Sequence, residues 1–312
     1  MHEAPMRLKS VFSDADIFCA AGAGWDVEFR QLDAGPLTAA LEVVAASGVA
    51  AQRIHLNRRF HQQGCPPKGM LTFGIPDPSK ILSWNSSPLS RPKLLNFNSR
   101  NGYDSVSEAG FSGKTFSIAE EVFQDAATIL GFDIDTERFA DAADRISVSF
   151  IDRDRITEAA DKLFNESQFG SAEAEFANIE LQDELVLAIV TAASDSVAAQ
   201  HKVHYSQRQK AVNRALDYIR SVRQPVPVRD LYKVSSCSER TLDRGFQERF
   251  GVSPKKYMVA MRMIGARRAL QLSPPESRVA DIANEWGFWH PGRFSVEYRR
   301  MFGERPTDSL KP

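Results

Sequence analysis

Apolar residues in the last third of the chain recur at helical spacing, and the same pattern occurs twice. The first copy contains Val228, Asp230 and Leu231, then Leu242, Phe246, Phe250-Gly251 and Pro254; the second contains Val279, Asp281 and Ile282, then Phe294, Tyr298, Phe302-Gly303 and Pro306. The offset is 51 residues over the first three positions and 52 over the others, so the second copy has one extra residue in its turn. Such self-similarity indicates one supersecondary unit used twice. It predicts a helix, a tight turn and a second helix in residues 228–250 and again in 279–302.

Three further features of this region predict its remaining helices. Apolar positions between Arg208 and Ile219 indicate a helix ahead of the first unit, and Ser238 is a suitable N-cap for the second helix of that unit. Ser253-Pro254 begins a helix over residues 254–272, which at 1.5 Å per residue is about 28 Å long. That length suits a connection between two helices that enter a duplex about 34 Å apart. Of Arg262, Arg267 and Arg268 on this helix, we expect most to be solvated or paired with acids, and one or two to touch phosphate.

The N-terminal part of the chain changes from strand patterns to helix patterns. Between Trp25 and about Glu120, short alternating runs such as Leu71, Phe73 and Ile75 are separated by Gly and Pro clusters, which predicts a β-sandwich or a small barrel. Helical periodicity follows near residues 122–130, 156–163 and 176–193. The apolar stripe of the last of these can pack on its own domain or pair with a second copy of the chain, and the sequence leaves both interpretations open.

Charge is divided unevenly along the chain. Residues 201–312 hold 22 Lys and Arg against 11 Asp and Glu, a net charge of +11. Residues 1–200 hold 17 basic and 29 acidic residues, a net charge of −12, so the net charge of −1 for the whole chain conceals two opposite halves. A basic C-terminal region is typical of a protein that binds nucleic acid.

The order of landmarks in residues 208–312 resembles the tandem helix-turn-helix domain of AraC/XylS-type transcriptional regulators. The segments that carry the resemblance are VRDL, SERTL, FQERFGVSP, VADIA, WGF and YRRMFG. The resemblance covers about a third of the chain. It implies a bacterial transcription factor whose first recognition helix makes most of the base contacts. The N-terminal half resembles, more loosely, the barrel-plus-helices sensor and dimerisation domains of the same family.

The predicted fold class is therefore α+β. We expect a β-rich, cupin-like barrel or sandwich with helices over residues 1–196, a linker over 197–207, and an all-α tandem helix-turn-helix domain over 208–312. The implied partners are a double-stranded DNA operator, a second copy of the chain, a small-molecule effector and RNA polymerase.

The resemblance assigns candidate DNA contacts to both units. In the first unit they are Ser238, Glu239, Arg240, Thr241, Asp243, Arg244 and Gln247. In the second unit they are Pro291, Gly292, Arg293, Ser295, Val296 and Arg299. Four departures from the family pattern stand out. Ser236 replaces a turn glycine, Val296 replaces a frequent arginine, Pro291-Gly292 opens the second recognition helix, and Asp308-Ser309-Leu310 replaces the usual Tyr-Arg ending. The second unit is therefore expected to read DNA shape or phosphate more than base edges.

The alternative hypothesis is a cupin-type barrel enzyme fused to a DNA-binding tail. Such barrels hold a metal through a His-x-His pair, whereas His55 and His61 lie six residues apart, so we expect no metal, no cofactor and no enzymatic activity. Three scattered cysteines form no disulfide or zinc pattern. No apolar run approaches the roughly 18 residues of a membrane helix, and residues 1–10 lack the apolar core of a signal peptide, so we expect a cytoplasmic protein.

Overall fold

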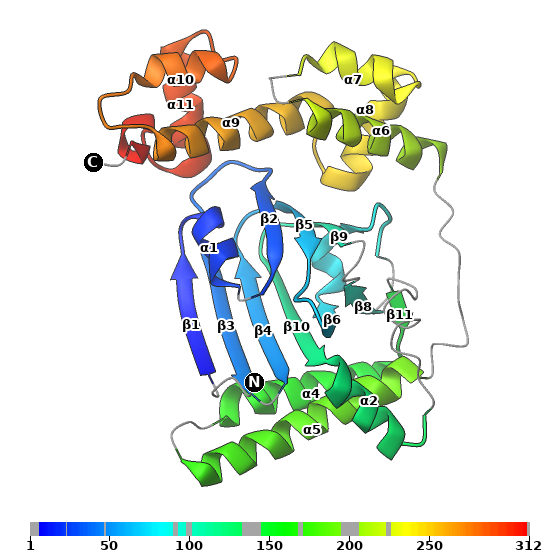
Figure 1. The fold of residues 1–312 in the computed structure, drawn as a ribbon. Helices are drawn as coiled ribbons and strands as arrows, with labels where there is room; N and C mark the ends of the chain where they lie inside the picture. Colours follow the sequence, from blue (N-terminus) through cyan, green and yellow to red (C-terminus); the bar gives the residue numbers. More distant parts are fainter. Residues whose placement is uncertain are drawn as a thin grey trace.

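The computed structural model describes residues 6–22, 24–46, 48–89, 93–97, 102–132, 145–167, 171–194, 206–222 and 226–310. These residues form a stack of layers (Figure 1). Helices lie at one end of the stack, two antiparallel sheets lie in the middle, and a wholly helical C-terminal region lies at the other end. The α+β fold class predicted from the sequence is confirmed.

Two antiparallel sheets make up the middle of the molecule. The larger sheet has the strand order β1-β3-β4-β10-β6-β8-β11, with β1 at Met6–Phe12, β3 at Ala39–Ala46, β4 at Val49–Leu56, β10 at Phe111–Ala119, β6 at Met70–Pro76, β8 at Lys93–Phe97 and β11 at Arg145–Ser147. The smaller sheet has the order β2-β5-β9-β7, with β2 at Asp26–Gln31, β5 at Phe60–Cys65, β9 at Tyr103–Ser107 and β7 at Ile81–Trp84. An apolar cluster that includes Phe29, Trp84, Phe97 and Phe111 lies between the two sheets.

Of the two architectures expected for the N-terminal half, the closed barrel is wrong and the sandwich is correct. Within the described ranges, no strand ladder joins the two sheets, so β1 and β11 are edges of one sheet and β2 and β7 are edges of the other. Edge strands must avoid pairing with other chains. Strand β1 carries Arg7 and Lys9, and β11 is only three residues long, so both edges are poor templates for a further strand.

The sequence analysis missed the two elements that begin the described chain. Strand β1 pairs with β3 in register from Met6 opposite Ala45 to Phe12 opposite Ala39. Helix α1 (Ala15–Ala21) follows, and the Asp14 side chain caps it by accepting hydrogen bonds from the backbone N–H groups of Asp16 and Ile17.

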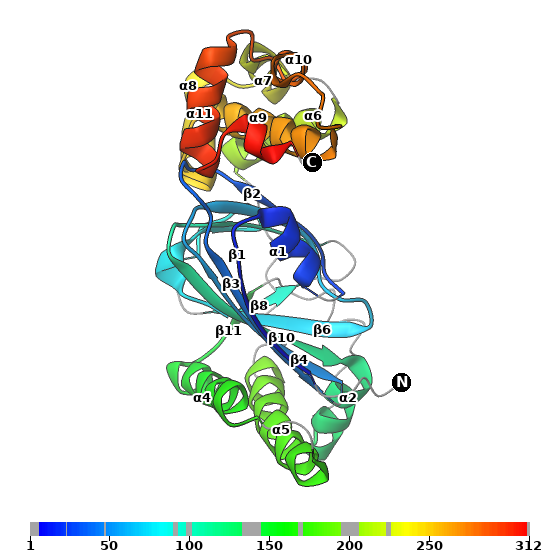
Figure 2. The same ribbon diagram turned by 90° about the vertical axis from the view of Figure 1, so that its left-hand side faces the viewer.

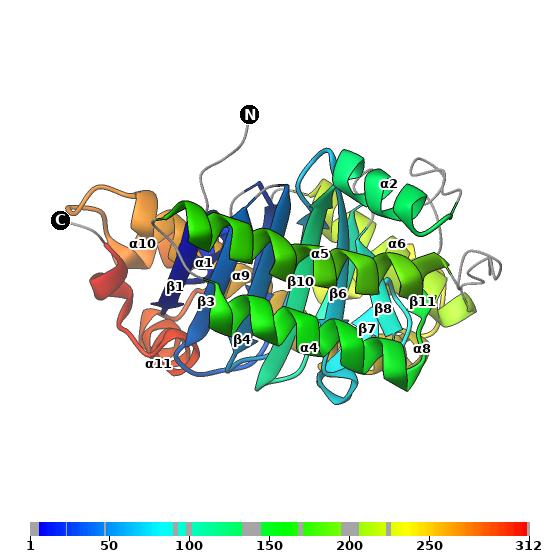
Figure 3. The same ribbon diagram turned by 90° about the horizontal axis from the view of Figure 1, so that it is seen from below.

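Among the described residues, helices α2 (Glu120–Ile129), α4 (Phe150–Glu166) and α5 (Ala172–Ser194) cover the outer face of the large sheet (Figure 3). Helix α5 lies between α2 and α4 when the sheet is seen from below in Figure 3. The second half of α5 buries Leu185, Val186, Ile189, Val190 and Ala193 against the sheet, so the intramolecular packing interpretation holds for that half. Phe176, near its start, is 72% exposed.

The C-terminal region contains six α-helices among its described residues. They are α6 (Gln207–Ser221), α7 (Val228–Ser235), α8 (Glu239–Phe250), α9 (Pro254–Leu272), α10 (Val279–Glu285) and α11 (Pro291–Phe302), followed by the short η2 (Pro306–Ser309). The linker predicted at 197–207 lies outside the described residues except for Ser206, which caps α6, and Gln207, which begins it. Two apolar cores form here, one around α6, α7 and α8 and the other around α10 and α11, and α9 contributes to both.

Candidate nucleic-acid interface

The first repeated unit consists of helices α7 and α8 joined by a tight turn. Ser236 ends α7 in the left-handed backbone region, with φ +51° and ψ +41°. A side chain is strained in this geometry, which is consistent with the glycine expected at this turn from the family pattern. Ser238 caps α8 by accepting a hydrogen bond from the backbone N–H of Thr241, and Gly251 ends the helix with φ +67°.

Helix α8 presents two chemically different faces. Its inner face buries Leu242, Phe246 and Phe250 completely. Its outer face exposes the sequence-predicted residues Ser238, Glu239, Arg240, Asp243, Arg244 and Gln247, while Thr241 is half-buried. The helical spacing of the apolar residues thus places the polar candidates on one accessible surface.

The two arginines on the outer face of α8 are available to a ligand. Among the described residues, none forms an ion pair with Arg240 or Arg244. Asp243, between them, accepts a hydrogen bond of 3.3 Å from the Tyr232 hydroxyl of α7. Burial, followed by the charge of Asp243, raises the pKa of Tyr232. The α8 surface therefore offers two guanidinium groups and a held carboxylate.

The second unit likewise consists of two helices, α10 and α11, joined by a turn. Gly287 lies in this turn with φ +78°. Pro291, Gly292, Arg293, Ser295, Val296 and Arg299 are all exposed on α11. Arg293 forms an ion pair with Glu297 one turn later, at 2.8 Å, and the Ser295 hydroxyl donates to the carbonyl of Pro291. Val296 is 69% exposed and Trp289, just before the helix, is 73% exposed. This surface is therefore more apolar than that of α8.

Both recognition helices lie on the same side of the C-terminal region. Figure 2, which looks along α9, shows α11 in front of α8 on one side of α9, whereas Figure 1 shows the two helices toward opposite ends of α9. The C-terminal end of each points toward the sandwich, and the opposite end points away from it. One straight partner can therefore meet both helices.

A buried polar cluster joins the first unit to the sandwich, and the sequence analysis did not identify it. Asp104 on β9 forms an ion pair with Arg249 on α8, with 2.8 Å between Oδ1 and Nη2. Asp104 also bonds His61 on β5 at 3.0 Å, and the other ring nitrogen of His61 lies 2.9 Å from the hydroxyl of Tyr257 on α9. Burial alone would raise the pKa of Asp104, but His61 and Arg249 outweigh it and hold that pKa well below its usual range. The cluster therefore keeps a carboxylate ionised inside the domain interface.

Helix α9, which connects the two units, is also attached to the sandwich by charged groups. Arg268 on α9 bonds Asp16 and Glu28, each at 2.7 Å, and Arg267 bonds Asp14 at 2.9 Å. These two arginines therefore pair with acids, which is one of the outcomes expected from the sequence. Arg262 instead donates to the Gly287 carbonyl and lies over the Phe288 ring.

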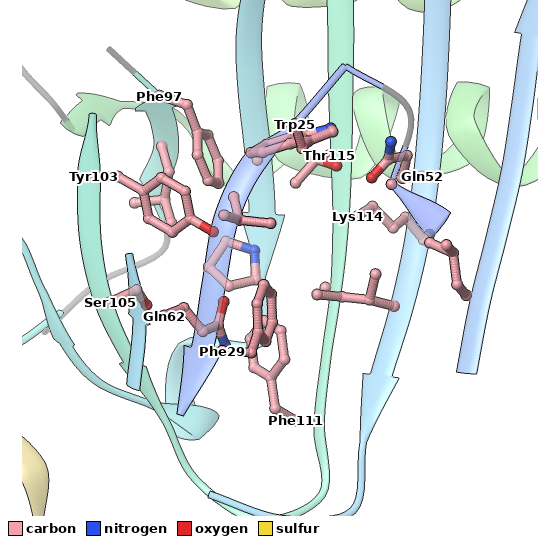
Figure 4. Close-up of a pocket in the computed structure, with 18 of the residues that line it drawn as sticks. Trp25, Phe29, Gln52, Gln62, Phe97, Tyr103, Ser105, Phe111, Lys114 and Thr115 are labelled. Carbon is pink, nitrogen blue, oxygen red and sulfur yellow. The ribbon is translucent and has the colours of Figure 1, made fainter. Parts of the chain in front are cut away.

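An aromatic cavity lies between the two sheets (Figure 4). Its walls include Trp25, Phe29, Trp84, Phe97, Tyr103 and Phe111, and its polar lining includes Gln52, Gln62, Ser105 and Thr115. Lys114 is the charged residue of the lining, and Asp161 neutralises it at 2.8 Å. The indole N–H of Trp25 is buried and has no hydrogen-bond partner among the described residues. The arrangement suits an uncharged, largely apolar molecule that carries a hydrogen-bond acceptor.

The metal site of the enzyme hypothesis finds no support in the described residues. His55 is exposed and bonds Ser112, whereas His61 belongs to the interface cluster. No group of three or more His, Cys, Asp and Glu side chains that could hold a metal ion occurs in the described part of the chain. In the same part of the chain, no helix has the length and apolar character needed to cross a membrane.

Comparison with known proteins identifies the C-terminal region. Residues 231–311 match a family model described as a helix-turn-helix domain. The chain is 37% identical over 102 residues to a probable thc operon regulatory protein of Rhodococcus erythropolis, covering 32% of this chain and 31% of that protein. It is 32% identical over 111 residues to XylDLEGF operon transcriptional activator 3 of Pseudomonas putida, covering 34% and 33%. It is 40% identical over 73 residues to the HTH-type transcriptional activator RhaS of Escherichia coli O139:H28, covering 23% and 26%.

These matches span about a third of the length of the first two relatives. Among solved structures, ToxT from Vibrio cholerae aligns over 99% of this chain and 98% of its own, with 11% identity and a TM-score of 0.30. The C-terminal region is a tandem helix-turn-helix domain of the AraC/XylS type, and the resemblance seen in the sequence is confirmed for that region.

Proposed function

We propose that this chain is a sequence-specific DNA-binding transcriptional regulator. The observation that carries the proposal is the pair of helices α8 and α11, which lie on one side of a basic domain with their polar faces exposed. Each is the second helix of a helix-turn-helix unit, the element that enters the major groove. The relatives of this domain are named as operon regulators and activators, which supports a role in transcription.

Within this proposal the two recognition helices make different kinds of DNA contact. On α8, Arg240 and Arg244 carry guanidinium groups that can donate two hydrogen bonds to guanine, so this helix supplies most of the sequence preference. On α11, Arg299 contacts phosphate, while the apolar Val296 suits contact with a thymine methyl group. RNA polymerase is a further partner in this proposal, as expected for an activator.

The N-terminal sandwich controls this activity through a small-molecule effector or through dimerisation. The small sheet lies between the cavity and the helix-turn-helix domain (Figure 1). Strands β5 and β9 expose alternate residues to the two sides: Gln62 and Ser105 line the cavity, while His61 and Asp104 contact the C-terminal domain. A molecule that shifts Gln62 or Ser105 therefore acts directly on the strands that hold α8.

The test is selection of DNA by the full-length protein from a random-sequence duplex library. We expect enrichment of a defined sequence, and binding to it should weaken steeply with salt because phosphate contacts release counterions. Retention of all duplexes alike would leave only non-specific binding. No salt-dependent retention on any duplex would overturn the proposal.

A further inference from the structure

The C-terminal end of each recognition helix lies against the sandwich, and residues of the sandwich donate hydrogen bonds to backbone carbonyl groups there. The last carbonyl groups of a helix have no partner within the helix. At the end of α8, Arg59 donates from Nη1 to the Gly251 carbonyl at 3.0 Å, and the Ser83 hydroxyl donates to the Arg249 carbonyl at 3.2 Å. These donors come from the β4–β5 turn and from β7.

The end of α11 is held in the same way by a different loop. Gln31, the last residue of β2, donates from Nε2 to the Met301 carbonyl at 3.1 Å, and the backbone N–H of Gly35 donates to the same carbonyl at 3.1 Å. Gln31 is 5% exposed, and its side-chain amide also donates to the carbonyl groups of Asp33 and Gly35 at 2.8 Å. The β2–β3 loop is thus fixed to α11 by a buried amide.

These two attachments lie at opposite sides of one small sheet. The sheet order β2-β5-β9-β7 places the contacts to α11 at the β2 edge and most contacts to α8 on β5, β9 and β7. Adjacent strands in a sheet keep a spacing of about 4.8 Å, because their backbone hydrogen bonds fix it. Within the C-terminal domain, the two units have separate cores and α9 is the element common to both. A single helix bends and twists more easily than a helix braced along its length by a sheet.

We propose that the sandwich is a brace that fixes the distance and angle between α8 and α11, and that Gln31 and Arg59 are the positioning residues of this brace. The proposal rests on the DNA-binding function proposed above. Its consequence is specificity for spacing. The braced protein accepts two major-groove segments at one separation, whereas loss of the contacts at the ends of α8 and α11 lets these helices tilt and adjust to several separations.

The experiment uses the duplex selected by the full-length protein and variants of it with one or two base pairs inserted or removed between the two contacted segments. Each inserted base pair moves one segment by about 3.4 Å and about 35°. The wild-type protein should lose about tenfold or more in affinity for each change, comparable to a mismatched base pair. The double variant Gln31→Leu/Arg59→Met, which keeps side-chain volume but removes both donors, should lose about threefold or less.

The controls separate positioning from folding. Arg7→Met removes an arginine whose partner, Glu42, lies on the large sheet, so this variant should keep the wild-type spacing profile. Arg59→Lys keeps a charged donor and should restore part of the spacing preference. If circular dichroism shows that the double variant is not folded, the single variants Gln31→Leu and Arg59→Met are tested in its place.

The outcomes are distinct. A flatter spacing profile in the donor-free variants, with binding to the selected duplex retained, supports the brace. An unchanged profile, or an equal loss of affinity at every spacing, overturns it and leaves the DNA-binding proposal intact. If the wild-type protein retains no duplex from the library, both the brace and the DNA-binding proposal are overturned.

Discussion

Asp104 of the small sheet and Arg249 of the first recognition helix form an ion pair of 2.8 Å, and the Arg249 side chain is only 7% exposed. Arg249 lies on the face of α8 opposite the candidate DNA contacts, where Asn213 also accepts from it at 2.6 Å. The helix for which we propose base reading is therefore anchored to the sandwich by a buried arginine.

Removing one partner of this pair should destabilise the protein strongly. Asp104→Asn keeps the shape of the side chain but leaves Arg249 buried without its carboxylate. We expect the free energy of unfolding to fall by about 3–5 kcal/mol, as for other broken buried ion pairs. Urea denaturation followed by circular dichroism measures the change.

Asp161→Asn is the matched control, because Asp161 is 42% exposed and pairs with Arg53 and Lys114 at the other side of the sandwich. Its loss should cost about 0–1 kcal/mol. An equal fall in the free energy of unfolding for the two substitutions would mean that the Asp104–Arg249 ion pair stabilises the protein no more than the exposed ion pairs of Asp161 do.

Stability should also fall between neutral and mildly acidic pH because of His61. Burial lowers the pKa of His61 despite the neighbouring Asp104, and the charges of Arg30 and Arg249 act in the same direction. A histidine with a lowered pKa contributes stability above its unfolded pKa of about 6.5, and that contribution is lost as the pH falls toward the lowered value. Thermal denaturation of the wild type should thus show a falling Tm from pH 7 to pH 5.

The variant His61→Gln can still bond Asp104 and Tyr257 but cannot gain a proton in this range. Its Tm should depend less on pH than that of the wild type. His55→Gln changes an exposed histidine and should behave as the wild type does. If the Tm of all three proteins falls equally with pH, the pH dependence does not come from His61.

Ser236→Gly should stabilise the protein. Ser236 adopts φ +51°, where glycine has no steric penalty, so relief of strain should outweigh the greater flexibility of glycine in the unfolded chain. We expect a gain of about 0.5–1 kcal/mol in the free energy of unfolding. Ser235→Gly, one residue earlier, removes a buried hydroxyl that donates to the Tyr232 carbonyl at 2.9 Å and should destabilise. The two neighbouring substitutions should differ in sign.

The local structure of the C-terminal half was predictable because it is encoded locally. Leu242, Phe246 and Phe250 recur at helical spacing, Ser238 caps their helix and Gly251 ends it, so the bounds of α8 follow from adjacent residues. The predicted range 254–272 agrees with α9 for the same reason.

The contacts between the two halves were not predictable, because nothing local distinguishes them. Asp104 and Arg249 lie 145 positions apart in the sequence and resemble ordinary surface charges. Their partnership depends on how β9 and α8 meet. Strand β1 escaped notice for a related reason: as an edge strand it keeps most of its side chains exposed and lacks an apolar run.

Dimerisation through α5 predicts a specific role for Phe176. The second half of that helix is buried against its own sheet, so pairing with a second chain must use the first half, where Phe176 is 72% exposed. Phe176→Asp should convert a dimer into a monomer in sedimentation at micromolar concentration. Phe150→Asp, an equally exposed position on α4, is the control and should leave the dimer intact. A monomeric wild type would show that α5 serves only its own domain.

Arg244 should determine a base preference. It lies two residues after Leu242 and two before Phe246, both fully buried, and its own side chain is exposed without an ion pair among the described residues. An arginine in this position can donate two parallel hydrogen bonds to guanine O6 and N7, worth about 1–3 kcal/mol of discrimination. Arg244→Ala should weaken binding to the selected duplex about 5- to 150-fold and relax the preference at one base pair.

Arg299→Ala provides the contrast, because a phosphate contact carries no sequence information. This variant should weaken binding to specific and scrambled duplexes alike and reduce the dependence of affinity on salt by about one phosphate contact. Both variants should be titrated on both duplexes at matched salt. If Arg244→Ala loses affinity equally on the two duplexes, Arg244 is a phosphate contact, and base reading by α8 must rest on Arg240 and its neighbours.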